Sequence, residues 1–141
     1  VADVLLRLIY HYLQNDQHHH AAVLGDHVAH TVRATGGKGA VAGLLAVNGY
    51  IAAARAARGD SPDAIAAARR VDRDRAVALA RFLDDKFPND NATDAVRHRL
   101  AELLTEAKRF PHASDVLLKV RPGYAQLTNA RLLQGYVASE L

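Results

Sequence analysis

Apolar residues recur every three or four positions along most of the chain, which is the spacing of amphipathic α-helices. Proline, glycine and short polar runs interrupt this pattern and mark the expected helix ends. No credible run of strand-forming residues interrupts the helical pattern. The pattern therefore predicts an all-α fold whose seven helices cover residues 2–13, 18–34, 38–58, 62–87, 93–109, 111–120 and 124–141.

The expected helices differ in how much apolar surface they carry. The third is apolar nearly all round, which is typical of a helix in the middle of a stack. Its uncharged part, residues 39–54, is shorter than the roughly 20 residues needed to cross a bilayer. The fourth is expected to bend or break near Val71 and Asp72. Short connections predict that successive helices are antiparallel, so we expect residues 1–141 to form one domain of stacked helical hairpins.

A pair of residues four positions apart recurs in alternate expected helices. Its first member is small or aliphatic and its second is aromatic or Leu, and the four-residue step places both on one helix face. The surroundings also recur, since residues 49–52 (GYIA) resemble residues 135–138 (GYVA). We interpret the pairs as an internal helical repeat, with core positions expected for its three tyrosines. The pairs are Leu8/Tyr12, Ala46/Tyr50, Leu100/Leu104 and Leu132/Tyr136.

The stretch 100–122 resembles the tetratricopeptide repeat family. Its first half has residues where the repeat's first helix places its Leu, its small residue and its aromatic, and its second half has the small and large residues of the second helix. The Trp and Gly typical of the repeat are absent, and the closing Pro arrives early. The matching positions are Leu100, Ala101, Leu104, Ala113, Leu117 and Pro122, with a second partial match at Ala76, Ala80, Leu83 and Pro88.

This resemblance implies a short, irregular α-solenoid, and members of such families are binding scaffolds. The Ala-rich, irregular repeats are more distantly similar to the α-solenoid part of bacterial membrane-coat-like proteins. We expect Leu100, Leu104 and Leu117 to be buried together. The first and last helices are apolar on more than one face, and the chain has no Met. We therefore expect a piece of a larger protein whose end helices are covered by further repeats or by self-association.

The charged residues give little support for a nucleic-acid partner. Lys and Arg number 18 against 15 acids, for a net charge of +3. In the basic run 69–75, two Asp alternate with the Arg, which is typical of a solvated helix face with weak pairs such as Arg70/Asp74. No aromatic residue for stacking lies beside it. A nucleic-acid-binding helical domain remains one alternative interpretation.

Histidines supply the other alternative, a metal-binding domain that uses the cluster from His18 to His30. The three consecutive residues 18–20 point in different directions on a helix, so they cannot chelate as a unit. We interpret them as a solvated helix start that folding does not require. The candidate ligands with suitable spacing are His20, His27 and His30.

The sequence contains a weaker indication of a phosphate-binding loop and none of cysteine chemistry. The Gly-rich segment 35–39 precedes a helix but lacks the Ser/Thr and the preceding strand of a phosphate-binding loop. The absence of Cys excludes disulfides and cysteine nucleophiles. We therefore expect no enzymatic activity and no cofactor, and a protein–protein interaction scaffold whose partners are other proteins or repeats of its own parent chain. The compartment, cytoplasmic or periplasmic, stays open.

Overall fold

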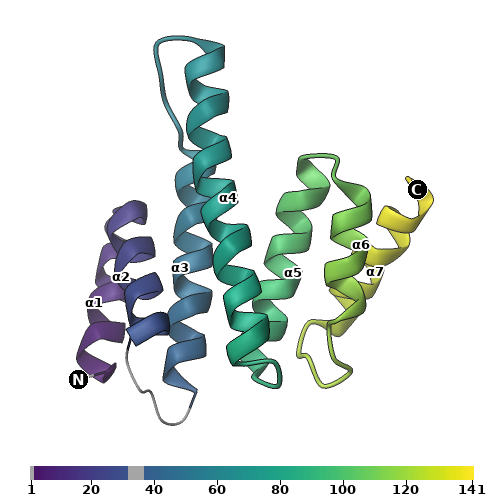
Figure 1. Ribbon diagram of the computed structural model, residues 1–141, viewed down its shortest axis with the longest axis horizontal. Coiled ribbons are helices and arrows are strands. Elements are labelled where there is room, and N and C mark those ends of the chain that lie inside the picture. Colours follow the sequence, from purple (N-terminus) through teal and green to yellow (C-terminus); the bar gives the residue numbers. More distant parts are fainter. Residues whose placement is uncertain (1, 32–36) are drawn as a thin grey trace.

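The computed structural model describes residues 2–31 and 37–141, which form seven α-helices and no β-strand. The all-α prediction is confirmed. The helices follow one another in chain order from one end of the molecule to the other (Figure 1). Their bounds are α1 (Ala2–Gln14), α2 (His18–Thr31), α3 (Lys38–Arg55), α4 (Pro62–Lys86), α5 (Asn91–Glu106), α6 (Phe110–Leu118) and α7 (Leu127–Ser139).

The ends of the described helices lie within three residues of those expected from the sequence. The expected break near Val71 and Asp72 is wrong, because α4 continues through both residues. Helix α7 begins at Leu127 rather than at Tyr124, since residues 124–126 form a turn closed by a backbone hydrogen bond from Leu127 to Tyr124. The expected end of the second helix falls on residues 32–34, which lie outside the described residues, as do positions 35 and 36 of the Gly-rich segment.

Helix α3 is the central element. Every helix packs against its neighbours in sequence, and α1 contacts α3, α3 contacts α5, and α5 contacts α7. Helix α3 therefore contacts four others: α1, α2, α4 and α5. Most of its residues are buried, which confirms that the third expected helix belongs in the middle of the stack.

Two glycines allow the backbones of α2 and α3 to approach closely. A Cβ atom at Gly25 would lie 2.7 Å from the carbonyl oxygen of Ala42, and one at Gly49 would lie 2.9 Å from the carbonyl oxygen of His18. Both distances are shorter than any stable contact between these atoms. The two helices can therefore pack at this separation only while both positions lack a side chain.

The main apolar core extends from α2 to α7. It contains Leu100, Leu104 and Leu117, each at most 5% exposed, so the expectation that they are buried together is confirmed. A smaller core lies between α1, α2 and α3 around Ile9 and Val28.

A buried network of charged side chains connects α4, α5 and the segment after α6. Asp94 is fully buried and accepts hydrogen bonds from Arg97 Nη1 at 2.7 Å, Arg121 Nε at 2.9 Å and the Arg121 backbone N–H at 3.2 Å. Arg97 also donates to Asp84 at 2.7 Å and to the Pro88 carbonyl at 3.2 Å. Because these acceptors and donors satisfy one another, the charges can be buried.

Replacing Leu104 with Ala should lower the free energy of unfolding by about 2–5 kcal/mol, because it leaves a cavity where α5 and α6 pack. Urea denaturation of the two proteins measures the difference. A loss below about 0.5 kcal/mol, typical of a surface substitution, would contradict this packing.

Gly25→Ala and Gly135→Ala should have opposite effects on stability. Alanine is favoured over glycine inside a helix by about 1 kcal/mol, and a Cβ at Gly135 in α7 meets nothing within 4 Å, so Gly135→Ala should stabilise. At Gly25 the added Cβ collides with the backbone of α3, and the overpacking should cost about 1–3 kcal/mol. Thermal denaturation of both variants tests this, and equal shifts would contradict the close approach.

Candidate functional site

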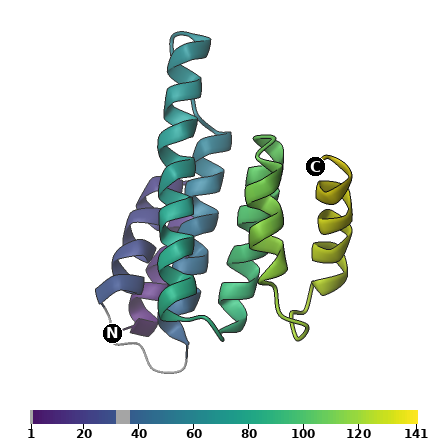
Figure 2. The same cartoon turned by 45° about the vertical axis from the view of Figure 1, so that its right-hand side comes forward.

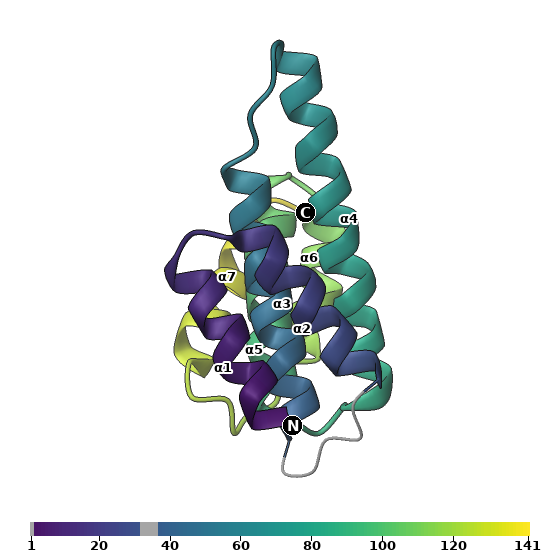
Figure 3. The ribbon, with the colours of Figure 1, turned by 90° about the vertical axis from the view of Figure 1, so that its left-hand side faces the viewer.

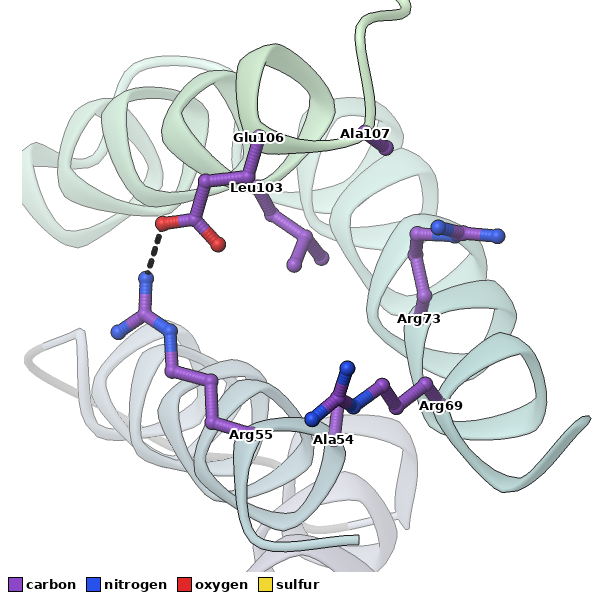
Figure 4. Close-up of a pocket in the computed structure, with 7 residues that line it drawn as sticks. All are labelled: Ala54, Arg55, Arg69, Arg73, Leu103, Glu106 and Ala107. Carbon is purple, nitrogen blue, oxygen red and sulfur yellow. Dashed lines mark hydrogen bonds and ion pairs between the residues drawn. The ribbon is translucent and has the colours of Figure 1, made fainter. Parts of the chain in front are cut away.

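An open cavity of about 330 Å³ lies between the end of α3, the middle of α4 and the end of α5. Three arginines line it, Arg55 from α3 and Arg69 and Arg73 from α4. Figure 4 shows the Arg69 side chain reaching from α4 toward α3, with Arg55 linked to Glu106 on the opposite wall. The floor is apolar and is made of Ala54, Leu103 and Ala107.

The length of α4 positions these arginines. Ser61 caps its first turn by accepting a hydrogen bond from the Ala64 N–H, and Pro62 occupies the first turn, where its missing N–H is tolerated. The helix that follows extends beyond the end of α3 (Figure 3). Arg69 and Arg73 are four residues apart and therefore share a face of α4. That face borders the ends of α3 and α5, and Arg69 reaches toward α3 while the guanidinium group of Arg73 turns away from Arg55 and Glu106 (Figure 4).

A second cavity of about 460 Å³ adjoins the first along α4. Arg69 and Arg73 line both cavities, and the second adds Arg70. Its apolar wall is formed by Pro62, Ile65 and Ala66. We call the surface formed by Arg69, Arg70 and Arg73 the arginine track.

The arginine track lies beside one ion pair but takes part in none among the described residues. Glu106 pairs with Arg55 at 2.6 Å. None of the three arginines of the track pairs with an acid in the part of the chain that the structure describes. The Nε atom of Arg73 is buried and has no hydrogen-bond partner there.

The sequence singled out the run 69–75 but misjudged its pairing. The suggested Arg70/Asp74 pair is not among the ion pairs of the described residues, and the nearest intrahelical pair joins Arg75 to Asp72 at 3.8 Å. Asp72 is buried, and its carboxylate lies 3.0 Å from His19 Nε2 on α2. The four-residue step of Arg69 and Arg73 was visible in the sequence, but the cavity they face was not.

The histidine candidates separate in space. His20 and His27 line an apolar cavity of about 520 Å³ together with Leu8 and Tyr12. His30 instead stacks on Phe82, with ring centres 3.7 Å apart, and its Nδ1 lies 2.8 Å from Asp26 Oδ1. Across residues 2–31 and 37–141, no three His, Cys, Asp or Glu side chains are grouped as metal ligands would be.

Two tyrosines are held in polar contacts inside the fold. The Tyr50 hydroxyl donates to Asp26 at 3.0 Å, and burial, followed by the charge of Asp26, raises the pKa of Tyr50 to about 12. Burial also raises the pKa of Tyr124, whose hydroxyl lies 2.9 Å from His98 Nδ1. Both hydroxyls are therefore protonated at neutral pH.

The repeat positions divide into two groups. The middle pairs are buried, and Ala113 and Leu117 with them, as expected of core positions. The last pair is not, since Leu132 is 69% exposed and Tyr136 52% exposed. The expectation of a core Tyr136 is wrong: its ring meets only the edge of the stack at Phe110 of α6, with ring centres 6.3 Å apart, and no described helix lies beyond α7 to cover it (Figure 2). In the first pair, Tyr12 is half-buried and Leu8 is exposed. The buried repeat positions are Ala46, Tyr50, Leu100, Leu104, Ala113 and Leu117.

Both ends of the stack present apolar side chains to solvent. Val4 and Leu8 are exposed on α1, and Leu132 and Tyr136 on α7. Part of the expectation about the terminal helices is therefore confirmed: both carry exposed apolar surface.

Comparison with protein-family models, with curated proteins and with solved structures finds no match to this chain. Among the described residues, no helix has the length and hydropathy needed to span a bilayer.

Changing His18, His19 and His20 together to Gln should shift the melting temperature by only a few degrees. The direct losses are the contact of the exposed His19 with Asp72, since a single hydrogen bond contributes about 0.5–1.5 kcal/mol, and the packing of the His20 ring against Tyr12. Melting with and without a chelator checks this. A large loss of stability, or a wild-type melting point that falls with chelator, would indicate a structural metal.

Proposed function

We propose that this chain is a non-catalytic interaction scaffold, a tetratricopeptide-like helical-repeat segment that assembles with other proteins or with further repeats of its parent chain. The contact pattern supports the proposal. Among the described residues, the main helix contacts join helices one or two places apart in sequence, and each odd-numbered helix touches the next odd-numbered one. Repeat proteins have this nearest-neighbour arrangement, in which the stack stays open at both ends.

The observation that carries the proposal is the exposed apolar surface of the two terminal helices. A solenoid that ends in solution needs a polar capping face, whereas α7 exposes Leu132 and Tyr136 and α1 exposes Val4 and Leu8. Apolar groups gathered on one face favour contact with another protein. Both terminal helices are therefore assigned as binding faces.

The two other candidate functions have less support. A metal-binding domain would need His20, His27 and His30 together, whereas His30 stacks on Phe82 away from the cavity that the other two line. A nucleic-acid domain would use the arginine track, which has apolar rather than aromatic walls. A membrane-coat-like parent assembly is a more specific version of the scaffold proposal, and only the irregular, Ala-rich repeats support it.

The scaffold proposal predicts concentration-dependent self-association of the isolated chain through its ends. Sedimentation velocity at several concentrations should show a rising mean mass, and the double variant Leu132→Gln/Tyr136→Gln should reduce it. Leu118→Gln is the matched control, because Leu118 is 65% exposed but belongs to α6 rather than to a terminal helix.

A wild-type chain that stays monomeric at every concentration would contradict the assignment of the end faces and favour a closed helical bundle. An equal effect of Leu118→Gln would show that general surface hydropathy, rather than the end face of α7, drives the association.

A further inference from the structure

We propose that the arginine track on α4 binds an extended, acidic segment of a partner protein through the carboxylates of that segment. The proposal rests on the scaffold function and names the chemistry of one partner. The arginine track lies along the side of the stack, whereas the proposed assembly with further repeats or other copies uses the terminal helices at its two ends.

The two cavities along α4 form one elongated surface. They share Arg69 and Arg73, and together their α4 residues run from Pro62 to Arg73. At 1.5 Å per residue, this part of the helix is about 16 Å long. An extended chain advances about 3.3 Å per residue, so the surface matches roughly five residues of an extended segment.

Arg73 is the residue that most clearly lacks a partner. The other arginines that are buried or half-buried in the described residues are Arg97, Arg99 and Arg121, and each pairs with a carboxylate. Arg73 is half-buried too, and its Nε has no acceptor. That Nε is itself buried, so a partner's carboxylate would bind the terminal nitrogens of Arg73, which have no ion pair among the described residues, through the charge-assisted hydrogen bonds that the other three arginines already have.

The first cavity already accommodates one carboxylate. Glu106 extends from α5 to Arg55 across its opening (Figure 4). Arg69 and Arg73 line the same cavity from the facing helix, without an acid among the described residues. A second carboxylate, supplied by another chain, can therefore bind the guanidinium group of Arg69 in this cavity as Glu106 binds that of Arg55.

The surroundings favour an acidic protein segment over a phosphate or a nucleic acid. The walls contain Leu103 and Ile65, which suit apolar residues between the acids of a peptide. No aromatic side chain lines either cavity to stack on a base. The C-terminal ends of α3 and α5, with their partial negative charge, border the first cavity and oppose a doubly charged phosphate more strongly than a single carboxylate.

Binding of a fluorescein-labelled peptide in which glutamate alternates with alanine, with blocked ends, tests the proposal by anisotropy. We expect saturable binding that weakens with salt and is absent for the same peptide with glutamine in place of glutamate. Arg69→Gln/Arg73→Gln should weaken binding at least about tenfold, which corresponds to about 1.4 kcal/mol.

The matched control is Arg7→Gln/Arg131→Gln, which removes the same charge from exposed positions on α1 and α7 and should change affinity less than about twofold. Circular dichroism and melting temperature confirm that each variant folds. Arg73→Lys keeps the charge but removes the planar guanidinium group that can bind a carboxylate with two parallel hydrogen bonds, so it should give an intermediate loss.

Equal losses in both double variants would overturn the proposal, because they would indicate attraction by net charge alone. Tighter binding of a single-stranded oligonucleotide, or displacement of the peptide by inorganic phosphate at equal concentration, would reassign the track to phosphate. Absence of saturable peptide binding would also overturn it. Sedimentation of Arg69→Gln/Arg73→Gln separates the two proposals, since self-association through the ends should persist in this variant.

Discussion

The close contact between the backbones of α2 and α3 is the constraint on which the arrangement of the other helices depends. Gly25 and Gly49 hold the two helices at a separation that admits no side chain at either position. Helix α3 then presents its remaining faces to α1, α4 and α5 at once. A helix rich in Ala and Gly can contact four others because its own side chains occupy little space.

The second half of the stack depends on a different interaction. There, buried charges rather than small residues connect the elements, since Asp94 joins its own helix to Arg121 beyond α6 while Arg97 reaches Asp84 on α4. Removing one member would leave an uncompensated buried charge, which is strongly unfavourable. The network therefore determines where the chain resumes after α6 and how α7 is placed against α5.

The cavity lined by arginines follows from the lengths of the helices. Helix α4 has 25 residues and its neighbours α3 and α5 have 18 and 16, so its first turns are not covered on the side where those helices end. Arg69 and Arg73 lie where this uncovered part begins, and their charges meet no acid of the described residues. The stack therefore exposes apolar side chains on its terminal helices and a basic surface along its side.

The sequence by itself determined the helices, the burial of α3 and the grouping of Leu100, Leu104 and Leu117, because each follows from local periodicity and apolar content. It identified the basic run on α4 and the histidines of α2 as candidate site residues, but it did not predict which residues lie around them. Only the tertiary structure decided that Tyr136 is exposed while Tyr50 is buried, although both belong to the same repeated pattern. The physical reason is that periodicity defines an apolar face of a helix, whereas burial of that face requires a neighbouring helix to cover it.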